Sequence, residues 1–333
     1  MTAIFLCDYP DSVERVYAGG IKSRMEKNIG IAPKVFTKKD VISNSAEFAN
    51  TQFVFSTWGM PAFSEEEITA CFPKLKCVFY AAGSVQHFAY PFLNRGIRIF
   101  SAWRANAITG AEYTVAQIVL ATKGFFRAAM LMSSGAASEA AEIHSDYPGN
   151  YDETVGLLGC GAVGTAVINL LKSYCLKVIV FDPFLSEERA KALHVELGTL
   201  NDVFSRARVI SNHLANNADT KQMLGYDYFS KMRLHSVFLN TGRGAQVVEE
   251  DLARVLENRP DITAILDVTD PEPPIPGHRF YSLPNCILTP HIAGSLGNEA
   301  RRMAALMEHT YESYCSGQIS PDEVTMTMLK TMA

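Results

Sequence analysis

The chain has 333 residues, enough for two domains that each bury a core of their own. Its 48% hydrophobic and 20% charged residues are typical of a globular protein, and the net charge of −5 argues against nucleic acid as a partner. Seven scattered cysteines without a CxxC pair argue against a disulfide framework, so we expect reduced thiols and no metal site.

The first hundred residues alternate short apolar runs with helical patterns, which is typical of parallel βαβ units. We expect strands at residues 3–8, 52–56, 76–80 and 97–101, and a helix that begins at Ser64. The opening sequence, MTAIFLCDYPDS, lacks a basic segment, so we expect no secretory signal and a cytoplasmic protein. These elements predict one doubly wound domain.

A long apolar helix is expected next, from about Ala111 to Met132. Gln117, Lys123 and Arg127 interrupt its apolar surface, which favours a buried core helix over a membrane span, and we expect no membrane partner. The polar, glycine- and proline-containing stretch at residues 144–153 then resembles a crossing between domains.

A second alternating series predicts the six strands of a dinucleotide-binding sheet, at residues 154–159, 177–182, 208–212, 236–240, 262–267 and 286–289. A last helix, starting near Asn298, has one apolar face that we expect to return to the first domain. The predicted fold class is therefore α/β with two doubly wound domains. A Rossmann NAD-binding domain (106–298) is inserted in a flavodoxin-like substrate domain (1–105 and 299–333).

The segment TVGLLGCGAVG runs from a predicted strand into a helix with Gly159, Gly161 and Gly164 in GxGxxG spacing. Gly159 permits the tight turn, Gly161 lets the backbone approach a pyrophosphate, and Gly164 allows close packing of helix on strand. Asp182 ends the next strand, where its carboxylate accepts hydrogen bonds from ribose hydroxyls and favours NAD over NADP. An ordinary glycine turn with a solvated aspartate is the alternative.

Three polar side chains follow apolar strands of the second series. Arg243 stands in NTGRG, Glu272 in DPEPP and His291 in TPHIAGS. The carboxyl ends of parallel strands are where open α/β sheets bind ligands. A guanidinium that binds a carboxylate, an imidazole acid and a carboxylate that orients it are what reduction of a keto acid requires. We predict that the three residues are catalytic, although each alone is commonly a surface residue.

The blocks GLLGCGAVG, NTGRG, PEP and TPHIAGS, in this order and spacing, resemble the D-isomer specific 2-hydroxyacid dehydrogenase family. The resemblance covers about residues 52–310 and implies an NAD-dependent enzyme with an active site in the cleft between its domains, and a homodimer. It implies that Arg243 binds the substrate, Glu272 orients the histidine and His291 is the acid/base. Beside the three glycines and Asp182, the implied cofactor residues are Ala162, Val163, His213, Thr241, Asp267 and Ala293.

Upstream, YAAGSVQHF resembles the family's loop whose backbone amides bind the substrate carboxylate, which involves Ala82, Gly83, Ser84 and Val85. SAWRANAITGAEYTVAQ resembles the segment that leads into the interdomain helix and contributes Asn106. We therefore predict that these residues bind the substrate.

The chain departs from the family pattern in three places. The acidic residue that usually follows the carboxylate loop is absent, and HLANNADT replaces a proline-containing HxPLTxxT, which places His213 and Asn216 beside the nicotinamide. The stretch between Glu272 and His291 is short for the family. Trp58 and Trp103 are candidates for the pocket wall or for plain core.

The leading hypothesis is an oxidoreductase that transfers a hydride between NAD(H) and a small 2-hydroxy or 2-keto acid such as glyoxylate or hydroxypyruvate. A phosphorylated substrate is less favoured, because Arg98 and Arg104 are the only obvious extra cations near the carboxylate loop. The alternative is an NAD(H)-sensing scaffold, since the C-terminal binding proteins, which are transcriptional corepressors, share the fold and a similar Arg, Glu and His set. A formate dehydrogenase is a third hypothesis, which the PEP block disfavours.

Overall fold

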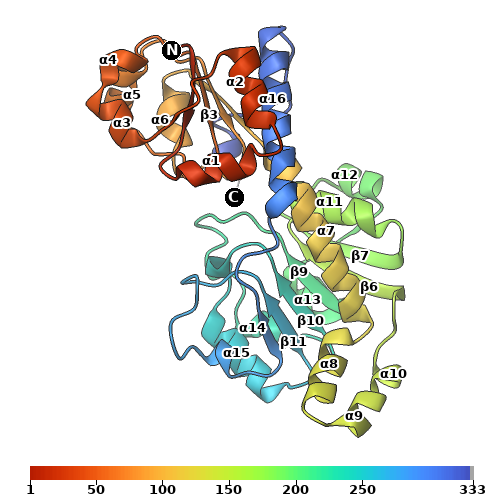
Figure 1. Cartoon of the computed structure of the whole chain (residues 1–333). Helices are drawn as coiled ribbons and strands as arrows, with labels where there is room; N and C mark the ends of the chain where they lie inside the picture. The colour runs from red at the N-terminus through yellow and green to blue at the C-terminus, as the bar shows by residue number, and fades with distance from the viewer. Residues whose placement is uncertain (331–333) are drawn as a thin grey trace. The chain divides into compact units, whose positions relative to one another are not determined.

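The computed structural model describes residues 1–330, which form two α/β units (Figure 1). The split unit comprises residues 1–107 and the described residues from 295 onwards, and the central unit comprises residues 108–294. The chain passes from the first to the second within α7 (Trp103–Thr122). Each unit contains a largely parallel sheet with helices on its faces, so the predicted fold class is confirmed.

The sheet of the split unit has the strand order β13-β5-β4-β3-β1-β2. Strands β1 to β5 are parallel, as in a flavodoxin-like sheet, and β13 is antiparallel to β5. The elements are β1 (Ala3–Leu6), α1 (Pro10–Val16), α2 (Ile21–Ile29), β2 (Val35–Phe36), α3 (Lys38–Ser43), α4 (Ser45–Phe48), β3 (Phe53–Ser56), α5 (Glu65–Cys71), β4 (Cys77–Tyr80), α6 (Ala89–Asn94), β5 (Arg98–Ser101), α16 (Ala300–Cys315) and β13 (Glu323–Val324).

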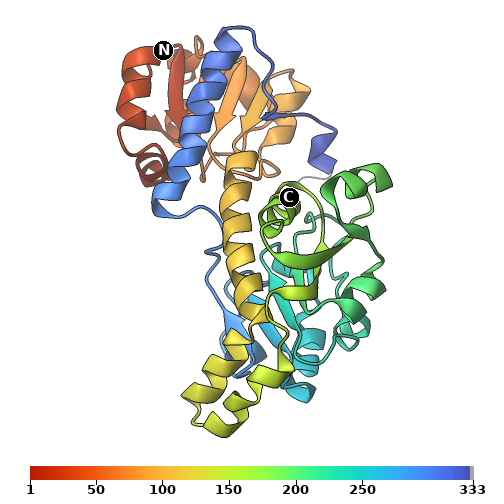
Figure 2. The same cartoon turned by 90° about the vertical axis from the view of Figure 1, so that its right-hand side faces the viewer.

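Helix α16 covers one face of this sheet (Figure 2). Its buried residues Ala300, Met303, Ala304 and Met307 recur at helical spacing and belong to the same apolar cluster as Phe79 of β4. The last helix of the chain therefore completes the core that the first hundred residues begin.

The sheet of the central unit is parallel throughout, in the order β12-β11-β10-β9-β6-β7-β8. The order reverses at β6, so the loops after β6 and β9 flank the position where such sheets bind ligands. The elements are α8 (Phe125–Ser133), α9 (Ala137–Ala141), α10 (Ile143–Asp146), β6 (Tyr151–Leu158), α11 (Ala162–Leu171), β7 (Cys175–Phe181), α12 (Glu187–Leu193), β8 (Glu196–Leu197), α13 (Leu200–Arg206), β9 (Val209–Asn212), α14 (Tyr226–Phe229), β10 (Val237–Asn240), α15 (Glu249–Asn258), β11 (Thr263–Leu266) and β12 (Cys286–Leu288).

The predicted continuous helix over 111–132 is wrong. Gly124 adopts φ +70° and separates α7 from α8, which are bent by 66° to one another. A Cβ at Gly124 would lie 2.7 Å from the Tyr147 ring, so this ring occupies the inside of the bend. The predicted crossing between domains at residues 144–153 is also wrong, because this stretch joins α10 to β6 inside the central unit.

Three short strands, β2, β8 and β13, were not expected from the sequence, and the central sheet has seven strands instead of six. Each of them contains only two residues, which is too short for an alternating pattern. Among the described residues, no single helix is long and apolar enough to cross a membrane, and α7 and α8 meet that test only as a bent pair.

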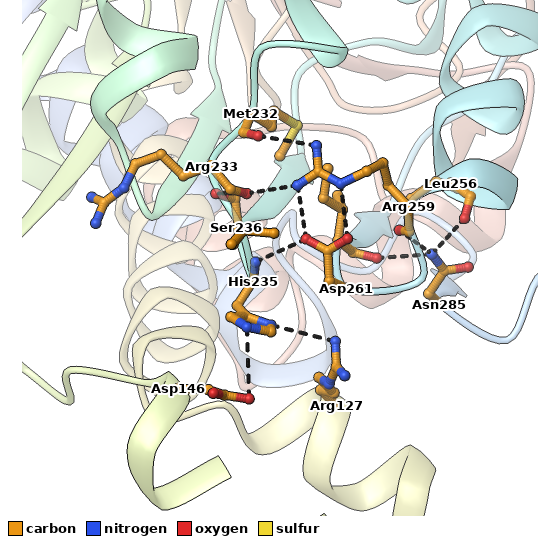
Figure 3. Close-up of polar contacts among 12 residues, drawn as sticks. Arg127, Asp146, Met232, Arg233, His235, Ser236, Leu256, Arg259, Asp261 and Asn285 are labelled. Carbon is orange, nitrogen blue, oxygen red and sulfur yellow. Dashed lines mark hydrogen bonds and ion pairs between the residues drawn. The ribbon is translucent and has the colours of Figure 1, made fainter. Parts of the chain in front are cut away.

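A polar network holds together the amino ends of β10, β11 and β12 (Figure 3). Arg259 donates to both carboxylate oxygens of Asp261 at 2.8 Å, and the backbone N–H of His235 donates to Asp261 Oδ2 at 3.1 Å. Burial raises the pKa of Asp261, but these donors outweigh it and keep that pKa below its usual range. The His235 ring lies 3.4 Å from Arg127 Nη1 on α8 and 3.6 Å from Asp146 Oδ2 on α10.

Asn285 closes the same network beside β12. Its buried Nδ2 lies 3.0 Å from Leu256 O, 2.8 Å from Ile262 O and 3.3 Å from Arg259 O, carbonyls at the end of α15 and before β11 (Figure 3). The carbonyl groups at the end of a helix have no intrahelical donors. The Asn285 amide therefore lies where water would otherwise donate to them.

We predict that Asn285→Ala lowers the free energy of unfolding by roughly 1–3 kcal/mol, because buried carbonyl oxygens lose their donor. Chemical denaturation of the wild-type protein and the variant measures this difference in the free energy of unfolding, provided that the two m-values are equal. Asn258→Ala is the matched control, since Asn258 is exposed on α15, and it should change stability by less than about 0.5 kcal/mol. Equal losses in the two variants would contradict this role of Asn285.

Candidate functional site

The three glycines of the turn after β6 differ in what surrounds them. Gly159 has φ +95°, and a Cβ there would lie 2.6 Å from His213 O. A Cβ on Gly164 would lie 2.2 Å from Gly159 O, so this glycine allows α11 to pack against the turn. A Cβ on Gly161 would meet no described atom within 4 Å. Gly161 thus stands beside open space at the start of α11, where helix N–H groups and the helix dipole favour an anion.

Ala162 and Val163 form the first turn of α11, directly after Gly161. Val163 packs against α7, since its methyl groups lie 3.6 and 3.8 Å from the position of a Cβ on Gly110. The glycine at 110 therefore lets α7 approach the first turn of α11 closely.

Asp182 follows β7 and is already hydrogen-bonded to the backbone. Its Oδ2 accepts from Cys160 N at 2.6 Å and its Oδ1 from Phe184 N at 2.7 Å. The carboxylate thus fixes the glycine turn, and its remaining lone pairs are those that a ribose hydroxyl would use. Arg189 of α12 donates to Thr165 Oγ1 at 3.0 Å and Cys160 O at 3.3 Å, which places a cation beside the same turn.

His213 follows β9, and its ring lies between two hydroxyl groups. Ser211 Oγ is 2.9 Å from Nε2, and Thr241 Oγ1, which follows β10, is 3.4 Å from Nδ1. Burial lowers the pKa of His213 to about 4, so the ring is neutral at physiological pH. His213 and Thr241 therefore form a neutral, polar surface next to Gly159.

Asp267 is buried at the end of β11 and holds the loop after β12. Its Oδ1 accepts from Thr289 Oγ1 at 2.6 Å and Ile292 N at 2.8 Å, and its Oδ2 accepts from Ala293 N at 2.8 Å. The backbone N–H of His291 donates to Asp267 O at 3.0 Å. The sequence marked Asp267 and Ala293 as cofactor residues, and the structure shows that they also fix the loop that carries His291.

His291 and Glu272 meet at the same edge of the sheet. His291 has φ +55°, and its Nδ1 lies 2.7 Å from Glu272 Oε1, although the connecting stretch is short for the family. Both side chains are partly exposed, at 45% and 40%. Burial lowers the pKa of Arg243, and the charge of Glu272 opposes this shift. The structure thus brings Glu272 and His291 into contact within the central unit, and Arg243 lies in another loop of the same unit.

A buried amide network positions the loop that carries Arg243, and sequence reasoning missed it. Asn212 Nδ2 donates to Asn240 Oδ1 at 3.0 Å and to Gln246 Oε1 at 2.6 Å, and Asn240 Nδ2 donates to Arg243 O at 3.1 Å. Gln246 Nε2 donates to Leu214 O at 2.8 Å, which links this loop to the one that carries His213. The available signal was the asparagine that ends each of the strands VISN and VFLN.

Gly244, next to Arg243, lies directly against the loop that carries Glu272. A Cβ on Gly244 would be 2.0 Å from the carbonyl carbon of Thr269, so only glycine fits at this contact. Close contact of the two backbones therefore holds the loop of Arg243 against the loop of Glu272.

The predicted carboxylate loop of the split unit follows β4. Ala82 and Val85 are buried, and Gly83 and Ser84 are partly exposed. A Cβ on Gly83 would lie 3.3 Å from Asn106 Nδ2, so Asn106 faces this loop, and its Oδ1 accepts from Ser295 Oγ at 2.9 Å. The structure thus brings together the four predicted substrate residues of this unit.

The two predicted wall tryptophans also lie after strands of the split unit. Trp58 follows β3 and packs partly buried against both apolar clusters of the unit, with the Arg15 guanidinium 5.8 Å from its ring centroid. Trp103 begins α7, and its Nε1 has no hydrogen-bond partner among residues 1–330.

A parallel sheet with a glycine turn at its switch point, an aspartate after the second strand and charged groups along the same edge defines a dinucleotide-binding α/β protein. The chain belongs to the D-isomer specific 2-hydroxyacid dehydrogenase family. The sequence pattern of that family's NAD-binding domain matches residues 115–293, more than half of the chain. The predicted family and the predicted cofactor, NAD, are thereby confirmed.

Curated relatives resemble the chain over part of their length. It is 29% identical over 222 residues to a D-3-phosphoglycerate dehydrogenase of Bacillus subtilis (strain 168), an alignment that covers 67% of the chain and 42% of the relative. It is 28% identical over 178 residues to a glyoxylate reductase of Aeropyrum pernix, covering 54% and 53%. The chain thus spans about half the length of the curated relatives that it matches.

Solved structures share the fold. A phosphoglycerate oxidoreductase from Rhizobium etli superposes with a TM-score of 0.78 at 20% identity, covering 97% of each chain. The NAD complex of a D-isomer specific 2-hydroxyacid dehydrogenase from Lactobacillus delbrueckii ssp. bulgaricus gives a TM-score of 0.77 at 18% identity, covering 98% of this chain and 100% of the other. These similarities extend the assignment of the fold to almost the whole chain.

We predict that alanine at Gly161 weakens NADH binding, whereas alanine at Gly164 lowers thermal stability. Gly161→Ala should keep the melting temperature but weaken NADH binding at least ~10-fold, because the new methyl fills the space that a pyrophosphate needs. Gly164→Ala should lower the melting temperature, because its Cβ collides with Gly159 O. Fluorescence titration with NADH and thermal melts measure both effects. Unchanged NADH affinity in Gly161→Ala would remove this glycine from the cofactor site.

The pKa of His213 predicts how stability depends on pH. The unfolded chain protonates this histidine below about pH 6.5, whereas the folded protein does so only near pH 4. The neutral ring therefore makes its full contribution to the free energy of unfolding above about pH 6.5, and this contribution is lost as the pH falls from about 6.5 to 4. His213→Gln should flatten the decline of melting temperature over this range. His144→Gln, on an exposed residue, should keep the wild-type slope, and equal slopes in all three proteins would refute the prediction.

Proposed function

We propose that the protein is an NAD-dependent dehydrogenase that transfers a hydride between NAD(H) and a small 2-hydroxy or 2-keto acid. The contact between His291 Nδ1 and Glu272 Oε1, at the edge of the sheet that carries the glycine turn, supports this most directly. An imidazole that pairs one nitrogen with a carboxylate can act as a general acid through its other nitrogen.

The central unit would hold the cofactor through residues that lie along one edge. Gly161 and the first turn of α11 offer backbone amides to a pyrophosphate, and Asp182 offers oxygens to a ribose. When bound, NADH supplies the hydride. His213 and Thr241 present a neutral surface, which suits a nicotinamide ring whose charge changes during the reaction.

The proton is assigned to His291. Glu272 accepts a hydrogen bond from Nδ1, which leaves Nε2 free to donate to the alkoxide that forms as a keto acid is reduced. The carboxylate also stabilises the imidazolium before the transfer. In the oxidative direction the same nitrogen accepts the hydroxyl proton.

Within the split unit, the loop at Ala82–Val85 is assigned to the substrate carboxylate. Within the central unit, Arg243 is assigned as a further anion-binding residue. Arg243 uses Nη1 for Gly242 O at 2.7 Å, so its other donors are available to an anion. The partly exposed backbone of Gly83 and Ser84 offers amide donors, and Asn106 faces Gly83. We therefore propose a substrate domain (1–105 and 299–333) and an NAD-binding domain (106–298), with boundaries a few residues from those of the two compact units. Residues 331–333 lie outside the described residues.

We also propose a cytoplasmic homodimer with no nucleic acid or membrane partner. Exposed apolar side chains on α8 support self-association, since Phe125 and Met132 are 50% and 60% exposed. Sedimentation of the purified protein measures the state of assembly.

We predict that His291→Ala lowers turnover of glyoxylate or hydroxypyruvate by roughly 10²–10⁴-fold and keeps the affinity for NADH, because it removes the proton donor and no cofactor contact. Glu272→Gln should lower turnover less, by about 10–100-fold, because the histidine remains. Stopped-flow and steady-state oxidation of NADH measure both.

The control is His144→Ala. His144 is an exposed histidine of α10 in the central unit, and its Nδ1 lies 3.1 Å from Ala141 O. The control variant should keep most of its turnover. Wild-type turnover in His291→Ala would remove this residue from the mechanism. NADH binding without turnover of any keto acid by the wild-type protein would instead favour the NAD(H)-sensing scaffold.

A further inference from the structure

The chain continues after α16 into a segment that we call the C-terminal strap, residues 319–330. It adds β13 antiparallel to β5, with Glu323 opposite Phe100 and Val324 opposite Ile99. Gln86, just after the carboxylate loop, donates from Nε2 to Leu329 O at 2.6 Å. Val324 is buried in the apolar cluster that also contains Ala82 and Val85. The strap is therefore a fixed part of the split unit beside the carboxylate loop.

Asp322 of the strap is linked to that loop by hydrogen bonds through Ser101. Ser101, the last residue of β5, donates from its backbone N–H to Asp322 O at 3.0 Å. The Ser101 hydroxyl lies 2.9 Å from Ala82 O and 2.6 Å from Gly83 O, and it shares its proton between them. One residue thus connects Asp322 to the backbone that we assign to the substrate carboxylate.

The side chain of Asp322 carries a buried and poorly solvated charge. It is 4% exposed, and its Oδ1 has no hydrogen-bond partner among the described residues. Arg104 Nη1 lies 3.9 Å away, and Ser320 Oγ donates to Oδ2 at a long 3.3 Å. Burial raises the pKa of Asp322, and the charges of Arg104 and, from α16, His309 oppose this shift. Arg104 is half exposed, so its charge faces both Asp322 and solvent.

Arg98, the other arginine of this region, pairs with a different carboxylate, that of Glu323. Arg98 begins β5 and donates to both carboxylate oxygens of Glu323, at 2.7 and 2.5 Å. Because a strand rises by about 3.3 Å per residue, the backbone of Arg98 lies about 10 Å from that of Ser101, and its guanidinium lies 5.1 Å from the ring centroids of Phe100 and Tyr314. Arg104 follows Ser101 by three residues, and Asp322 compensates its charge.

We propose that Asp322 is a specificity-determining residue that restricts the substrate to keto acids with a single anionic group. A substrate with a second anion, such as a phosphate ester, would need Arg104 as its partner, and the adjacent carboxylate both competes for that cation and repels the anion. A substrate whose only anion is its carboxylate does not need Arg104, so Asp322 does not lower its affinity. This inference rests on the proposed function and names the substrate class within it.

The test compares hydroxypyruvate with its 3-phosphate ester, which differ only by the second anion. Asp322→Asn keeps the shape of the side chain and removes its charge. We expect it to raise the ratio of kcat/KM for the phosphorylated over the free acid by about 10-fold, mainly through a lower KM for the ester. The double variant Asp322→Asn with Arg104→Gln should return to the wild-type ratio.

Glu323→Gln is the matched control, because it removes the same charge one residue further along the strap and releases Arg98, the residue that begins β5. It should leave the ratio unchanged. An unchanged ratio in Asp322→Asn, or an equal rise in Glu323→Gln, would overturn the proposal. If the asparagine variant fails to fold, Asp322→Ser provides the same loss of charge.

A second measurement separates this proposal from the proposed function. Thermal shift with glycolate and with phosphoglycolate measures binding without turnover, and phosphoglycolate should stabilise Asp322→Asn more than the wild-type protein. Absence of turnover by the wild-type protein would refute the dehydrogenase. The role of Asp322 would be refuted by equal thermal shifts in the two proteins.

Discussion

Parallel pairing in the central sheet is the constraint on which the proposed chemistry depends. The strands β6, β7, β9, β10, β11 and β12 run in one direction, so the residue that follows each of them emerges at the same edge. The glycine turn, Asp182, His213, Arg243, Glu272 and His291 are distributed over more than a hundred residues of sequence and share an edge for this reason. A single reversed strand would remove its residue from the site.

Alignment at an edge is not sufficient for catalysis, because loops after strands are free to move unless something fixes them. Here buried polar groups fix them. The carboxylate of Asp267 binds three donors of the loop that carries His291, and the amides of Asn212, Asn240 and Gln246 bind the loop that carries Arg243. Buried polar groups are costly when they lack partners, so the loops are stable only in the arrangement that satisfies them.

The split unit uses charge in a different way. Its carboxylate loop is neutral, and the nearby arginines are compensated by Asp322 and Glu323, which are consecutive residues of the strap. In our proposal, the carboxylate of Asp322 limits which anions bind beside Arg104, whereas Glu323 pairs with Arg98 where β13 lies against β5.

The sequence by itself determined the strands that form the two sheets, because runs such as KVIVFD and SVFLN combine β-branched residues with turn residues at both ends. It also indicated the glycine turn and the family, since spacing and residue type are local properties. It failed where the outcome depends on a distant neighbour. The Tyr147 ring lies against Gly124 at the break between α7 and α8, and the two-residue strand β13 exists only because β5 offers it an edge.

The same difference between local and distant properties applies to the candidate site. The candidate residues could be predicted from the sequence, whereas the groups that support them could not. Arg243, Glu272 and His291 are recognisable in their own segments, but their contacts, the second role of Asp267 and the position of Asp322 beside Arg104 follow from tertiary packing alone. The sequence determined which groups are present, because residue identity is local. Only the tertiary structure decided which of them touch, because a contact between distant segments is set by the pairing and packing of whole elements.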